Sequence, residues 1–309
     1  MKKIFIAFAA LATIAACNKA EVIETPEGEA IAFANVFIDN ATKAGEATDP
    51  SFNGPNKLTK FQVWGTANNV AIFAGEDVTG KVEENSIWTC TKKQYWVEGV
   101  NYDFAAVVNG TVTSLSNGLP ATISYTANGT SDLIYAESMD VVGKAAGSNV
   151  PIEFTFAHLL AKAKFTVETN TDVEGYSYEV TNIKITNAYA SGTYDIAEEK
   201  WNGVAGSGQA FSTITVSSTD KNQECEQEKL LIPLETVTVS YDVALKYGSE
   251  VIWSQTDNTV TPTGLKLEAA KSYNFKLTLN VGEEIKFSVE TDPTWTAWPS
   301  EPSEPELAL

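Results

Sequence analysis

The feature that most constrains the fold is an alternation of apolar and polar residues at every second position. It is clearest at 161–168, 237–245, 273–279 and 285–289. In the first segment Ala161, Ala163, Phe165 and Val167 alternate with Lys162, Lys164, Thr166 and Glu168. This period is typical of a strand that covers a core on one face and meets water on the other. No long stretch has helical periodicity, so the sequence predicts an all-β chain built as sandwiches.

Shorter apolar runs predict further strands, and Asn-Gly pairs such as Asn109-Gly110 and Asn128-Gly129 mark turns between them. The runs are 61–65, 70–73, 102–108, 123–125, 133–135, 152–156 and 180–187. The stretch from Val141 to Val150 is rich in small residues and is the candidate domain boundary. The prediction is an N-terminal β-sandwich at 31–148 and a C-terminal β-sandwich at 149–298.

The N-terminus has the features of an export signal. Met1-Lys2-Lys3 is a positive head, and the apolar run Ile4–Ile14 is too short to span a bilayer as a helix. Ile14-Ala15-Ala16-Cys17 then resembles the lipobox of bacterial lipoproteins. The resemblance implies that residues 1–16 are a signal peptide and that Cys17 is lipidated, which would anchor the protein to lipid of the cell outer membrane. The alternative is an ordinary secretory signal in which Cys17 is incidental.

The two ends of the predicted mature chain have the composition of extended segments. Residues 17–30 are polar and acidic and are predicted to be a lipidated tether. Residues 299–309 carry a proline at every third position at first, and an acidic, proline-rich tail of this kind is predicted to be extended and outside any sheet.

The charge balance excludes one class of partner. Against 40 acidic residues stand 21 basic ones, all of them lysines, for a net charge of −19. A surface this acidic repels nucleic acid and anionic headgroups, so nucleic-acid binding is not expected.

No pattern of reactive residues predicts an enzyme, a metal site or a cofactor. The one histidine, His158, lies in an apolar strand-like phrase, and no spacing singles out a pair of carboxylates. There is no CxxC motif or His/Cys cluster for zinc. With Cys17 acylated, Cys90 and Cys225 either pair or remain free thiols. The seven tryptophans are expected mainly in cores, with a sugar-stacking platform as the alternative.

Seven local phrases resemble, in the same order, the fimbrillins that build the lipoprotein-derived pili called type V. They are Thr42–Gly45 with Phe61–Gly65, Gln94–Val97 with Tyr102–Ala106, Asp132–Ala136, Phe156–Lys162, Leu231–Leu234, Ala270–Tyr273, and Ile285–Val289 with Trp295. The resemblance covers about residues 30–298. It implies two β-sandwiches of transthyretin-like topology, export as a lipoprotein, and assembly with other fimbrillin subunits into a surface fimbrium. In this family a protease removes the N-terminal strand, and the vacated groove accepts a strand from a neighbouring subunit.

Two departures leave the position in the fibre open. The family's cleavage follows an arginine, whereas this chain has Lys43 at the matching place, and its proline-rich tail is a poor donor strand. Stalk, tip, anchor and accessory roles all remain, and the alternative function is a monomeric surface lipoprotein that binds a glycan or a host protein.

The segment before Lys43 is the predicted exchangeable strand. Residues 31–38 are strongly strand-forming, with Ile31, Phe33 and Phe37 on one face. Burying three such side chains stabilises a fold by roughly 5–9 kcal/mol, at about 1.5–3 kcal/mol each. Residues 39–45 are polar and flexible in composition, which suits a trypsin-like protease. Proteolytic processing after Lys43 would let the strand leave.

Overall fold

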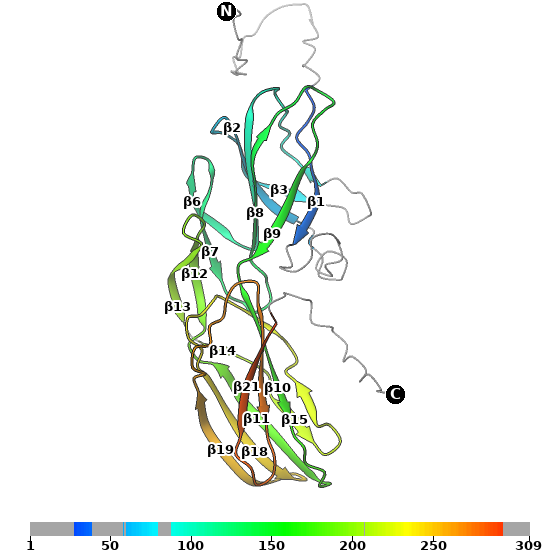
Figure 1. The fold of residues 1–309 in the computed structure, drawn as a ribbon, viewed down its shortest axis with the longest axis vertical. Helices are drawn as coiled ribbons and strands as arrows, with labels where there is room; N and C mark the ends of the chain where they lie inside the picture. Colours follow the sequence, from blue (N-terminus) through cyan, green and yellow to red (C-terminus); the bar gives the residue numbers. More distant parts are fainter. Residues whose placement is uncertain (1–27, 39–57, 59, 80–87, 207, 293–309) are drawn as a thin grey trace, which may run out of the picture.

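A computed structural model describes residues 28–38, 58, 60–79, 88–206 and 208–292. These residues form strands, turns and bends without a helix, so the predicted all-β class is confirmed. The strands build two β-sandwiches stacked end to end into an elongated molecule (Figure 1). Across the described part of the chain, no helix has the length and apolar character that a membrane span requires.

The first sandwich contains a seven-stranded sheet in the order β1-β9-β8-β5-β2-β3-β4. Its strands are β1 (Phe33–Ile38), β2 (Lys60–Ala67), β3 (Val70–Thr79), β4 (Thr89–Cys90), β5 (Asn101–Val108), β8 (Ile134–Val142) and β9 (Ile152–His158). All neighbours pair antiparallel except β1 and β9, which are parallel. One face of this sheet curls around an aromatic core, and the other packs on a four-stranded sheet. Both faces are therefore buried at the centre of the sheet, as the near-continuous burial of β5 reflects.

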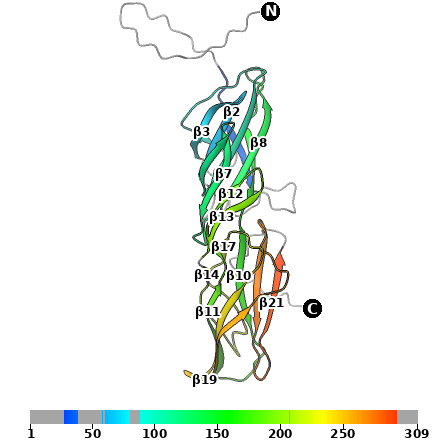
Figure 2. The ribbon, with the colours of Figure 1, turned by 90° about the vertical axis from the view of Figure 1, so that its left-hand side faces the viewer.

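The four-stranded sheet has the order β13-β12-β7-β6. Its strands are β6 (Thr111–Ser116), β7 (Leu119–Thr126), β12 (Tyr189–Asp195) and β13 (Lys200–Gly206). Figure 2 shows β12 and β13 beside β7 in this upper part of the molecule, although they follow β11 in the sequence. Segments distant in sequence therefore build the first sandwich together.

The second sandwich consists of two five-stranded sheets that pack over one core. One sheet has β16 (Asn222–Glu224), β10 (Ala161–Glu168), β20 (Ser272–Thr278) and β21 (Lys286–Asp292) in order, with β17 (Lys229–Leu231) also on β10. The other has β14 (Gln209–Ala210), β11 (Tyr176–Ile185), β18 (Val239–Tyr247) and β19 (Glu250–Val260) in order, with β15 (Ile214–Ser217) also on β11. Phe165 and Phe275 stack at 4.9 Å in the shared core.

The chain does not pass from one sandwich to the other at the predicted boundary. Val141–Val150 covers the last two residues of β8 and the connection to β9, and these strands are neighbours in the same sheet. The chain first crosses between β9 and β10, returns between β11 and β12, and crosses again between β13 and β14. The division into 31–148 and 149–298 does not coincide with these crossings, because β9, β12 and β13 complete the first sandwich by strand pairing.

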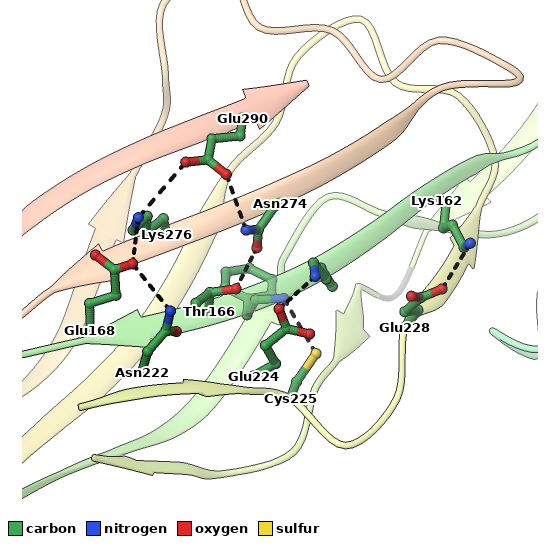
Figure 3. A network of polar contacts seen from close by, with 12 residues as sticks. Lys162, Thr166, Glu168, Asn222, Glu224, Cys225, Glu228, Asn274, Lys276 and Glu290 are labelled. Carbon is green, nitrogen blue, oxygen red and sulfur yellow. Dashed lines mark hydrogen bonds and ion pairs between the residues drawn. The ribbon is translucent and has the colours of Figure 1, made fainter. Parts of the chain in front are cut away.

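The polar face of β10 is buried, although its alternating sequence predicts that this face is exposed to solvent. Lys162, Lys164 and Thr166 are almost fully buried within a network of polar contacts (Figure 3). Lys162 pairs with Glu228 at 3.1 Å, Lys164 with Glu224 at 2.6 Å, and Thr166 donates to Asn274 at 2.8 Å. Burial of charge requires such partners. Desolvation nevertheless raises the pKa of Glu228 despite the nearby Lys162.

Candidate site of subunit assembly

The N-terminal segment 29–38 lies between two walls of the first sandwich. Its first wall is β9, with which β1 pairs in parallel register, Phe33 opposite Ile152. The pairing begins one residue earlier, where the Ile152 amide donates to the Ala32 carbonyl at 2.8 Å. β1 thus extends the seven-stranded sheet at its end.

The second wall is the segment 88–96. The amide of Ile31 donates to the Gln94 carbonyl at 2.8 Å, and the amide of Trp96 donates to the Glu29 carbonyl at 2.9 Å. Farther along, the Trp88 amide donates to the Phe33 carbonyl at 3.0 Å. Segment 29–38 therefore satisfies backbone groups on both sides, and its departure would leave two walls with unpaired donors.

The side chain of Phe33 lies at the centre of the aromatic core. It is 0% exposed, and its ring centroid lies 5.9–6.2 Å from those of four other phenylalanines. These are Phe61, Phe73, Phe104 and Phe154, from four different strands. Ile31 is buried in the same core, so the predicted common face of Ile31 and Phe33 is confirmed. The Phe37 side chain lies outside what the structure describes.

A carboxylate fixes the start of the segment. The Glu29 Oε2 atom accepts hydrogen bonds from the Asn149 side chain at 2.8 Å and from the amides of Gly147 and Asn149 at 3.0 and 3.2 Å. The Asn149 side chain and these amides lower the pKa of Glu29. Glu29 is thereby bound to the loop that connects β8 with β9.

The second wall is itself held by the body of the sheet. The Tyr102 hydroxyl on β5 accepts from the Val97 amide at 2.8 Å, and the Trp96 ring packs edge-on against Tyr102 at 4.8 Å. The Gln94 side chain donates to the Ile72 carbonyl on β3 at 3.0 Å. None of these contacts uses segment 29–38, so this wall has support that does not depend on that segment.

The remaining predicted residues divide into three groups. The predicted lipidation and processing sites, Cys17 and Lys43, lie outside the described residues, as do the signal peptide and the tail 299–309. Cys90 and Cys225 are free thiols in different sandwiches, so the disulfide alternative is wrong. His158 is buried at the end of β9, where its Nδ1 atom contacts the Asp132 carboxylate, as expected of a packed strand residue.

The described residues give no indication of a metal site, and most of their tryptophans are packed against cores. No group of three or more His, Cys, Asp and Glu side chains in the described ranges is placed to hold a metal ion. Trp64 and Trp96 are core residues, and Trp88 and Trp201 are half-buried against cores. Trp253 on β19 differs, with 44% of its surface exposed.

Solved structures share this two-sandwich architecture. A fimbrial protein from Bacteroides vulgatus ATCC 8482 is 14% identical with a TM-score of 0.57, over 86% of this chain and 99% of that one. A putative cell adhesion protein from Bacteroides ovatus ATCC 8483 is 12% identical with a TM-score of 0.55, over 88% and 99% of the two chains. At these identities the likeness concerns the fold alone. No curated protein sequence matches the chain significantly.

The molecule is thus an all-β protein of two sandwiches whose N-terminal segment is held between two walls of the first. The fimbrillin-like family model matches residues 42–294, and the chain belongs to that family. It is therefore a fimbrial protein of the cell surface with fimbrillin subunits as its partners, and it belongs with structural proteins and not with enzymes, as its sequence predicts.

Proposed function

We propose that this protein is a fimbrial subunit that assembles by strand exchange after a protease cuts behind Lys43. The observation that carries the proposal is the placement of segment 29–38, with Phe33 enclosed by four phenylalanine rings. After cleavage the segment has no covalent link to β2, and only non-covalent contacts hold it.

Departure of the segment creates a specific vacancy. The amides of Ile152, Trp88 and Trp96 lose their acceptors, and the Phe33 ring leaves a hole among aromatic side chains. Unsatisfied backbone groups and an empty apolar cavity both raise the free energy of the cut protein. Binding another extended strand lowers that free energy again. A strand from a neighbouring fimbrillin subunit supplies both the backbone partners and an apolar side chain.

The same cut would release the subunit from the membrane. Cys17, the proposed lipid attachment site on the outer membrane, precedes segment 29–38, and Lys43 follows it. One cleavage therefore frees the body from its acyl chains and opens the groove, which couples release to assembly.

The test compares brief treatment of the purified precursor with a Lys-specific protease across three chains. Lys57 also lies between segment 29–38 and β2, so all three chains carry Lys57→Ala, which leaves Lys43 as the one lysine in 39–57. The first chain has no other change, the second also carries Lys43→Ala, and the third, as matched control, also carries Lys144→Ala. SDS-resistant, heat-labile ladders are expected from the first and third chains, alone or with partner pilins, and not from the second. If all three stay monomeric with partners present, strand exchange fails.

In that event the second candidate, a monomeric surface lipoprotein that binds a glycan or a host protein, moves ahead. The observation that favours it is the exposed Trp253 at the far end of the molecule.

A further inference from the structure

A pocket of about 370 Å³ opens at the end of the second sandwich, away from the first sandwich. β10 starts at the junction between the sandwiches and β20 runs parallel to it, so the loop that follows β20 lies at the far end (Figure 1). The pocket lies between this loop and the hairpin of β18 and β19. Its size is that of a small-molecule site.

The pocket combines an apolar floor with one overhanging aromatic ring. Leu245 and Leu279 are buried core residues, and Ile285 is half-buried beside them. Trp253 lies directly opposite Leu245 in the register of β18 and β19, on the same face of the sheet. Among the described strands β19 is the last of its sheet, and 44% of the Trp253 surface is exposed.

Polar groups of the loop form the rim of the pocket. The Asn280 Nδ2 atom and Lys286 Nζ donate to Oε2 of Glu283 at 3.0 and 3.1 Å, so Oε1 is available to a ligand hydroxyl. The Asn170 amide donates to Asn280 Oδ1 at 3.0 Å, which fixes the loop against the end of β10. Acceptors that are fixed before binding reduce the entropy lost when a ligand binds.

This combination matches the chemistry of a sugar ring. A pyranose presents a face of C–H groups, which the negative face of an indole attracts, and an edge of hydroxyls, which amides and carboxylates bind. Hydrogen bonds from Asn280 and Lys286 lower the pKa of the Glu283 carboxyl and favour its charged form, with Lys286 as its paired cation. A charged carboxylate on a protein of net charge −19 disfavours acidic sugars.

We propose that this pocket binds a neutral mono- or disaccharide, with Trp253 stacked on the sugar ring and Glu283 and Asn280 on its hydroxyls. The site lies in the second sandwich, apart from segment 29–38, so the protein can bind sugar whether or not it exchanges strands. The inference therefore stands independently of the assembly proposal.

The test is calorimetric titration of the uncut protein with cellobiose, maltose, mannobiose and diacetylchitobiose, and with sialyllactose and digalacturonate as acidic probes. We expect saturable binding of at least one neutral probe. Trp253→Ala should weaken it by about tenfold or more, since loss of a stacked ring and its buried area is worth about 1.4 kcal/mol or more. Ile252→Ala is the matched control, because its side chain is similarly exposed, at 49%, and does not line the pocket.

Three binding results would overturn the proposal. They are a failure of every neutral probe to bind, equal loss in Ile252→Ala and Trp253→Ala, and binding of acidic probes as tight as that of neutral ones. A concentration-dependent dimer that Trp253→Ala abolishes would also overturn it, by assigning the surface to a second copy of the chain.

Discussion

The two strands β1 and β19 both end their sheets, yet they contribute to the fold in opposite ways. β1 has six residues, and its Phe33 is completely buried. β19 has eleven residues, and its first eight side chains are all exposed. The shorter strand is held by its side chain in a core, and the longer one by its backbone pairing with β18.

This difference indicates which strand suits exchange between subunits. Removing β1 uncovers a core and two walls, which only another strand with a bulky apolar side chain can restore. Removing β19 would expose little new core, since most of its side chains already meet water. Its edge is also interrupted by bulges: at Asp257, where φ is +58°, the amide turns to donate to the Asp242 carboxylate at 2.7 Å.

The largest expected effect concerns the side chain at the centre of the aromatic core. Phe33→Ala should lower the free energy of unfolding by about 3–5 kcal/mol, because it leaves a cavity among four rings. Ile252→Ala on β19 should change it by no more than about 0.5 kcal/mol, because that side chain is exposed. Denaturant titration measures both, and similar values for the two variants would remove the distinction between the strands.

An intermediate effect is expected from cleavage itself. Cutting after Lys43 should accelerate amide hydrogen exchange at Ile152, Trp88 and Trp96, whose acceptors lie on segment 29–38. Amides of β18 that pair with β19 should keep their protection, since no cut touches that hairpin. Mass-spectrometric exchange before and after cleavage checks this, and unchanged protection at all three amides would mean that the segment stays in place.

The smallest expected effect is a pH dependence of amide exchange that two carboxylates cause, one beside each strand. Glu29 holds segment 29–38 and Asp242 holds the β19 bulge, and hydrogen-bond donors lower both pKa values. Stabilisation from a lowered carboxyl pKa is complete above the unfolded value, near 4.5 for Glu29 and 3.8 for Asp242, and is lost as the pH falls through the folded value.

Acid should therefore lower the amide protection factors, which correct for the intrinsic pH dependence of exchange, in both regions. Glu29→Gln should flatten this pH dependence at residues 29–33 only, and Asp242→Asn at β19 only. Each variant is the control for the other. Loss of the pH dependence in both regions from either single change would contradict the assignment.

The sequence predicts well those strands whose apolar residues recur at every second position or form a short apolar run. β10 spans Ala161–Glu168, as its alternation indicates, and β2, β5, β9 and β20 lie at their predicted places. β19 has no such signal because nearly all its side chains are exposed, and β12 and β13 are hidden by Ser, Gly and Asn residues. A pattern based on burial cannot detect strands that bury little.

The site was only partly predictable for a related reason. Burial of Ile31 and Phe33 follows from apolar spacing, but their partners do not. The parallel pairing of β1 with β9 and the hydrogen bonds to Gln94 and Trp96 join segments far apart in the sequence. The sequence does not predict the buried polar face of β10. Lysines in an alternating strand are expected to be exposed, and only the structure shows that Lys162 and Lys164 pair with Glu228 and Glu224.

The central claim is that segment 29–38 is a removable strand whose place depends on Phe33. The most direct measurement uses a chain in which residues 40–46 are replaced by the recognition sequence of a single-site protease. After cleavage, a fluorescent peptide of residues 28–43 is added in excess, and its bound fraction is followed over time. We predict that the labelled peptide replaces the cut strand and restores exchange protection at Ile152, Trp88 and Trp96, whereas the same peptide with Phe33→Ala does not. Equal binding of both peptides, or a cut strand that never exchanges, would contradict the account.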